Sequence, residues 1–78
     1  MRVRILITGA TGFVGGWLGQ DLARAYPEAE LFGTAHRPGR RDDLPPRMQV
    51  RTVDLTDTTA LAAFVADARP DHVFHLAG

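Results

Sequence analysis

Three residue types that often carry chemistry are missing from this 78-residue chain, which has no cysteine, no serine and no lysine. Without cysteine the chain can form no disulfide, and that fits a reducing compartment. Without lysine it cannot contain a P-loop, because the G-x-x-x-x-G-K-[ST] pattern requires one. These absences exclude a disulfide and a P-loop.

The chain also lacks an excess of charge of either sign, since nine arginines balance nine acidic residues. A net charge of zero argues against nucleic acid or a membrane surface as a partner. The first apolar run is too short for the core of a signal peptide or for a membrane span. With 45% hydrophobic residues the composition is that of an ordinary globular chain. We therefore expect a cytoplasmic protein with one small core in these residues.

What the chain does contain is a glycine-rich turn between a strand pattern and a helix pattern, within Ile5–Gly15. Gly9 lets the backbone leave the strand in a tight turn, and Gly12 has no Cβ to obstruct a pyrophosphate. Gly15 lets the helix pack closely against the sheet. Because a helix N-terminus attracts phosphate, this order indicates a dinucleotide site. The alternative is a structural turn that binds nothing.

Periodicity predicts four strands and two helices. The strands are expected at Val3–Thr8, Glu30–Thr34, Met48–Val53 and Asp71–Leu76, and the first helix at about 12–25. The second helix is expected to begin after an N-cap at Asp57 and to stop at Arg69-Pro70, and Ala35–Pro46 is expected to be a polar loop. The core-facing stripes of the helices are predicted to be Val14, Trp17, Leu18, Leu22 and Ala25, and Leu61, Phe64, Val65 and Ala68.

This β-α-β-β-α-β order predicts the α/β class, as the N-terminal half of a Rossmann-type doubly wound parallel sheet. Right-handed crossovers give the strand order 3-2-1-4. The fourth strand, Asp71–Leu76, then lies at an edge, although its apolar run is typical of a strand covered on both sides. We expect these residues alone to be unstable or to associate through that edge.

The segment Thr8–Gly15 matches the T-G-x-x-G-x-x-G fingerprint of the short-chain dehydrogenase/reductases at every fixed position, so the chain resembles that superfamily. The resemblance implies that the turn binds NAD or NADP. The candidate residues for that role are Gly9, Thr11, Gly12, Phe13, Val14 and Gly15.

The active site of the superfamily uses a Ser/Thr, Tyr and Lys set, in which Tyr transfers the proton. That set cannot form within these residues, because serine and lysine are missing and the only tyrosine, Tyr26, precedes Pro27. We therefore predict no catalytic residue in 1–78 and interpret them as the dinucleotide-binding domain of a longer enzyme, truncated before its catalytic and substrate-binding parts. The alternative is a binding module without chemistry.

The end of the second predicted strand decides between NAD and NADP. An NAD enzyme presents an acid there to the ribose hydroxyls, but no acid occurs between Glu30 and Asp42. The chain instead has His36 and Arg37, with two more arginines at 40 and 41. A guanidinium can hold a 2′-phosphate that a carboxylate would repel, so NADP is predicted, with NAD possible. The alternative is a solvated charge run.

Two further segments follow strands. The resemblance implies that Asp54 accepts a hydrogen bond from the adenine amino group and that Leu55 covers the ring. The alternative for Asp54 is that it only shapes the turn. The segment His75-Leu76-Ala77-Gly78 is similar to the H-L-A-A segment of the extended branch, which passes along the ribose and pyrophosphate. It adds Leu76, Ala77 and Gly78 as candidates, whereas His75 is expected to be a packed strand residue.

Together these segments resemble the extended branch, the NAD-dependent epimerase/dehydratase family, which acts on nucleotide sugars. Residues 32–37 are most similar to GDP-mannose 4,6-dehydratases and GDP-4-keto-6-deoxy-mannose reductases, and the turn favours the reductases. We expect an NADP-dependent nucleotide-sugar reductase that is a homodimer when full length, with no metal site. Alternatives are a dehydratase, an epimerase or a non-catalytic NADP sensor.

Overall fold

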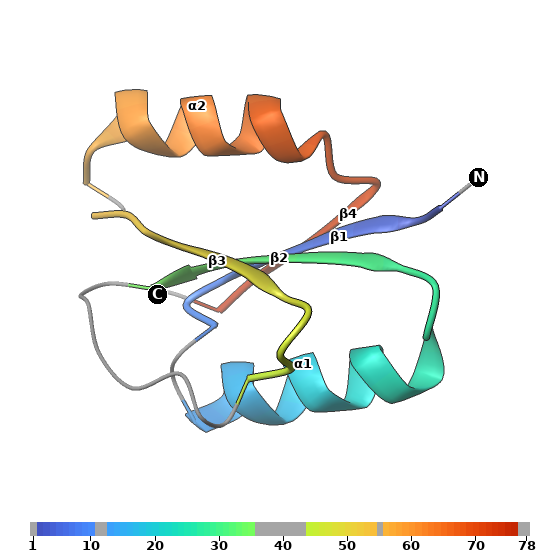
Figure 1. The fold of residues 1–78 in the computed structure, drawn as a ribbon. Helices are drawn as coiled ribbons and strands as arrows, with labels where there is room; N and C mark the ends of the chain where they lie inside the picture. Colours follow the sequence, from blue (N-terminus) through green and yellow to red (C-terminus); the bar gives the residue numbers. More distant parts are fainter. Residues whose placement is uncertain (1, 11–12, 36–43, 55, 77–78) are drawn as a thin grey trace.

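The computed structural model describes residues 2–10, 13–35, 44–54 and 56–76. Along the chain these form β1 (Arg4–Thr8), α1 (Phe13–Ala25), β2 (Glu30–Ala35), β3 (Gln49–Thr52), α2 (Thr58–Ala68) and β4 (His72–His75). The strands make one parallel sheet in the order β3-β2-β1-β4, and the two helices cover its opposite faces (Figure 1). The predicted α/β class, element order and strand order are confirmed.

The apolar run of β1 is explained by the covering of the sheet on both faces. Ile5 and Ile7 belong to the core cluster on the α1 side, whereas Leu6 between them belongs to the cluster on the α2 side. On that second side the ring of Phe64 meets Phe32 of β2 edge to face, with 6.3 Å between the ring centroids. β1 is therefore the central strand of both cores.

The predicted core-facing stripe of α1 is partly wrong. Leu22 is buried, but Trp17 is 63% exposed and Ala25 is also exposed. Leu18, also in the predicted stripe, packs against the core cluster. The helix also approaches closely at a small residue, since a Cβ added at Gly19 would lie 3.1 Å from Cε of Met48. The prediction used only large apolar residues and alanine, whereas a close approach to Met48 is made at Gly19, which has no side chain.

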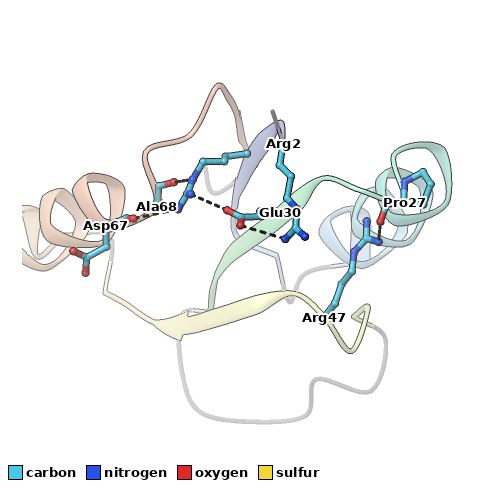
Figure 2. Close-up of polar contacts among 7 residues, drawn as sticks. Arg2, Pro27, Glu30, Arg47, Asp67 and Ala68 are labelled. Carbon is cyan, nitrogen blue, oxygen red and sulfur yellow. Dashed lines mark hydrogen bonds and ion pairs between the residues drawn. The ribbon is translucent and has the colours of Figure 1, made fainter.

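The segment before β3 belongs to the core, so the prediction of a polar loop as far as Pro46 is wrong at its end. Leu44 and Met48 are buried against the α1 side. Arg47 between them donates to the carbonyl oxygen of Tyr26 at 2.7 Å. It also donates to the carbonyl oxygen of Pro27 (Figure 2). A cation near the C-terminal end of a helix also interacts favourably with the helix dipole. The segment is thereby fixed to the end of α1.

The predicted ends of α2 are confirmed. The Asp57 side chain accepts from the backbone N–H of Ala60 at 3.1 Å, which is N-cap geometry. At the other end Arg69 adopts a left-handed conformation, with φ 46°, immediately before Pro70. Neither this helix nor the other described one is long and apolar enough to cross a membrane.

The predicted core-facing stripe of α2 is confirmed for three of its four residues. Phe64 and Ala68 are buried and Leu61 is half-buried, but Val65 is 37% exposed, so its predicted place in the core is wrong. Val65 follows Phe64 directly, and one residue turns the side chain by about 100° around the helix axis. The contact with the sheet is therefore narrower than the pattern suggested.

β4 is an edge strand, as predicted, and it hydrogen-bonds to β1. All four of its side chains are exposed. Val73 is 54% exposed, and Phe74 and the following Leu76 are each 38% exposed. This strand therefore presents large apolar side chains to solvent in the described structure.

Candidate functional site

The carboxyl ends of all four strands lie along one edge of the sheet, because the strands are parallel. The chain crosses from β1 to β2 on one side and later returns to place β4 on the other side of β1. A crevice outside the carboxyl ends at such a switch point is where open α/β sheets bind ligands. The candidate site is therefore at the end of β1, between β2 and β4.

The glycine turn leaves β1 at this point. Gly9 has φ 75°, a left-handed conformation that favours glycine, and Ala10 beside it is fully buried. After the turn, α1 begins at Phe13. No acidic residue lies in the first turn of this helix. The first N–H groups of a helix have no acceptor within it, so this end is suited to an anion.

Part of the predicted turn lies outside the described residues, namely Thr11 and Gly12. The backbone of Phe13, Val14 and Gly15 is helical, but their side chains also lie outside the description. Their roles in binding therefore stay predictions, and so does the core position expected of Val14. Within the turn, the structure describes the conformation of Gly9 and the start of α1.

Sequence reasoning missed the residues that hold the turn. In β2, Oγ1 of Thr34 accepts a hydrogen bond from the N–H of Gly9 at 3.0 Å. The carbonyl oxygen of Thr34 accepts one from the N–H of Ala10 at 2.9 Å. A Cβ added at Gly33 would lie 2.8 Å from Cβ of Ala10. A glycine inside a strand often marks such a close approach, and this was the signal available in the sequence.

On the other side of β1, the ends of two strands are joined. Oγ1 of Thr8 lies 2.6 Å from Nδ1 of His75, and the N–H of Leu76 donates to the carbonyl oxygen of Thr8 at 3.1 Å. His75 is exposed, so the prediction of a packed strand residue is wrong, although its ring is held by Thr8. The candidate Leu76 lies next to the turn, whereas Ala77 and Gly78 lie outside the described residues.

Asp54 follows β3 at the same edge of the sheet. Its Oδ1 accepts from the N–H of Thr56 at 2.9 Å and from the hydroxyl of Thr56 at 2.7 Å. These contacts shape the turn into α2, as in the second of the two roles considered for it. Leu55, the other adenine candidate, lies outside the described residues.

The end of β2 carries no carboxylate in the part that is described. β2 ends at Ala35, which is fully buried and accepts from the N–H of Val53 at 2.8 Å. The one acid of β2, Glu30, lies at the opposite end of the strand, where Arg4 approaches it to 2.8 Å and Arg2 to 3.7 Å (Figure 2). The candidates His36 and Arg37 lie outside the described residues.

No group of three potential metal ligands occurs in the described parts of the chain. Two cavities, of about 210 and 250 Å³, are found there, and both are lined by Val3 and Tyr26. Val3 precedes β1 and Tyr26 follows α1, so both cavities lie toward the amino ends of the strands, away from the glycine turn. They are not part of the candidate site.

The chain is similar over nearly its whole length to several bacterial proteins. The chain is 29% identical over 78 residues to the UDP-glucose 4-epimerase of Mycoplasma pneumoniae, across 97% of this chain and 23% of the relative. A Burkholderia cenocepacia crystal structure named provisionally as an epimerase matches with 37% identity and TM-score 0.85, over 97% of this chain and 25% of that one. The Bordetella bronchiseptica enzyme WbmG, solved in complex with NAD and UDP, matches with 30% identity and TM-score 0.81, over 100% and 26%.

The chain thus spans about a quarter of the length of the proteins that it matches. The family model described as "NAD dependent epimerase/dehydratase family" matches residues 5–78, from β1 through the glycine turn to the end of β4 and beyond. The chain therefore belongs to the NAD-dependent epimerase/dehydratase family.

Proposed function

We propose that residues 1–78 form the dinucleotide-binding domain of a longer enzyme, with the pyrophosphate held at the glycine turn and the N-terminus of α1. The observation that carries the proposal is the left-handed Gly9 between β1 and a helix with no acid in its first turn. Backbone N–H groups there would hold the anion without a lysine. The residues assigned to this site are Gly9, whose conformation makes the turn, and Thr11, Gly12, Phe13, Val14 and Gly15 after it.

For the adenosine end we propose NADP rather than NAD. The support is chemical: β2 ends in the uncharged Ala35, its only acid is bound to arginines at the far end, and His36 and Arg37 follow in the sequence. WbmG was solved with NAD, so this chain would differ from that relative in its cofactor. Arg37 would then hold the 2′-phosphate with charge-assisted hydrogen bonds.

We assign Asp54 and Leu55 to the adenine, and Leu76, Ala77 and Gly78 to the ribose and pyrophosphate. The carboxyl ends of β3 and β4 lead to these segments on the same edge of the sheet as the turn. In this assignment Asp54 has two tasks, since its Oδ1 also holds the turn into α2.

For the full-length enzyme we propose a nucleotide-sugar oxidoreductase, a reductase of a GDP-4-keto-6-deoxy sugar acting as a homodimer. The bound nicotinamide would supply the hydride, and a Tyr outside these residues would supply the proton. The second candidate is an epimerase, which is favoured by the similarity to the UDP-glucose 4-epimerase of Mycoplasma pneumoniae. Both use the same cofactor-binding edge.

Consumption of cofactor separates the two reactions. A reductase given NADPH and a GDP-4-keto-6-deoxy sugar oxidises one cofactor for each sugar reduced, so the absorbance of reduced nicotinamide falls. An epimerase returns the hydride to the same sugar, so UDP-glucose is converted to its epimer without net change in that absorbance. If the full-length protein binds the cofactor but turns over neither sugar, the proposed substrate class is wrong while the proposed cofactor site remains.

A further inference from the structure

The first half of the glycine turn is held by one residue of the neighbouring strand. Thr34 in β2 is 1% exposed, and its side-chain oxygen lies 3.0 Å from the backbone nitrogen of Gly9. Its carbonyl oxygen lies 2.9 Å from the nitrogen of Ala10. Both N–H groups at the start of the turn therefore point at β2, and they are not the groups that a phosphate would meet.

The residue before Thr34 completes this contact. A Cβ added at Gly33 would lie 2.8 Å from Cβ of Ala10 and 2.9 Å from Sδ of Met48. Separations below 3 Å are not tolerated by real side chains, and the methyl of Ala10 cannot move without its backbone. The thioether of Met48 is flexible by comparison. The absence of a side chain at Gly33 thus lets the turn lie against β2.

We propose that Thr34 is a positioning residue for the dinucleotide, and that it acts through Gly9 and Ala10, with Gly33 supplying the space. This inference rests on the proposed function of the turn. With the start of the turn fixed to β2, the N-terminus of α1 is held at one place relative to the sheet.

The hydroxyl is the essential feature of Thr34 in this account. Valine has nearly the same shape and suits a strand, but it leaves the N–H of Gly9 without its acceptor. Serine keeps the hydroxyl and loses only a methyl group. The pair Thr34→Val and Thr34→Ser therefore separates the hydrogen bond from the packing, and the exposed Thr59 of α2 offers a matched control, Thr59→Val.

The experiment is a titration of the full-length protein with NADP and with NAD, for the wild type and these variants, under conditions where circular dichroism shows each to be folded. We expect Thr34→Val to raise the dissociation constants of both cofactors by about tenfold, because the turn serves both alike. Thr34→Ser should stay within about twofold of the wild type, and Thr59→Val should match it. A purely structural role would lower the melting temperature and leave the affinity of the folded protein unchanged.

Unchanged affinity of folded Thr34→Val overturns the inference, and so does a loss in Thr34→Ser as large as that in Thr34→Val. If Thr34→Val does not fold, Gly33→Ala decides, because it displaces the turn while the hydroxyl remains. Weaker binding of both cofactors by that variant supports the inference, and unchanged binding contradicts it. A wild type that binds neither cofactor removes the proposed function itself, and the positioning role with it.

Discussion

The hydroxyl oxygen of Thr8 lies 2.6 Å from Nδ1 of His75, so side chains join the carboxyl ends of β1 and β4 beside the glycine turn. Thr8 is 3% exposed, whereas His75 is exposed. The contact therefore lies at the boundary between the core and the candidate site. It ties the edge strand to the strand that leads into the turn.

A double-mutant cycle tests this contact. Thr8→Val and His75→Phe each remove one partner, and each should lower the free energy of unfolding by about 1 kcal/mol. If the two side chains interact, the double variant should lose less than the sum, with a coupling of about 0.5 to 1.5 kcal/mol. His72→Phe on the same strand is the control, and its change should add to that of Thr8→Val. Additivity for the His75 pair would contradict the contact.

The Asp54→Ala variant should weaken NADP and NAD alike, since both carry adenine, by roughly 1 to 3 kcal/mol. Part of any loss could arise from the turn, because Oδ1 of Asp54 holds Thr56. Thr56→Ala measures the share of the hydroxyl contact, as it removes that contact and keeps both the carboxylate and the backbone N–H of residue 56. Cofactor titration of both variants decides. A loss in Thr56→Ala equal to that in Asp54→Ala would reduce Asp54 to a residue that shapes the turn.

The exposed edge strand β4 leads to a prediction about the stability of residues 1–78 on their own. Residues 1–78 on their own should aggregate, associate or melt without cooperativity, because the edge strand presents Val73 and Phe74 to solvent. Sedimentation and thermal denaturation of the 78-residue polypeptide measure this. A monomer with a cooperative melt at ordinary temperature would show that the exposed strand needs no cover.

The order of the elements could be predicted from the sequence because strand and helix patterns alternate clearly. Pro27, Asp57 and Pro70 mark the ends of the helices. The prediction failed where small residues make the contact. α1 packs inward through Gly19 as well as Leu22, and Trp17 is exposed despite its apolar character. A pattern of large apolar residues cannot reveal a surface defined by missing side chains.

The candidate site shows the same division. The position of Gly9 followed from local spacing, since a strand, a turn and a helix are continuous in the chain. Thr34 could not be found in that way, because its contact with Gly9 joins residues 25 positions apart. Such a contact depends on the register of β2 against β1, in which Ile7 pairs with Gly33. Register follows from the packed structure and not from the composition of either strand.

Arg37 separates the two cofactors. If its guanidinium holds the 2′-phosphate, Arg37→Ala should weaken NADP by about 1.5 to 3 kcal/mol, or one to two decades in dissociation constant. NAD lacks that phosphate and should bind nearly as before. NADP affinity should also fall more steeply with ionic strength than NAD affinity, since exposed ion contacts are screened. Equal losses for both cofactors would leave the preference for NADP without support.

If the glycine turn holds the pyrophosphate of a nicotinamide dinucleotide, as we propose, Gly12→Val should abolish binding. A branched Cβ at this position would occupy the space that the pyrophosphate needs, so the fold should suffer less than the binding. The measurement is the titration of the full-length protein and of this variant with NADP and NAD, after circular dichroism has shown that the variant is folded. We expect the wild type to bind both cofactors and Gly12→Val to bind neither measurably. A folded Gly12→Val variant with the affinity of the wild type would contradict the proposal.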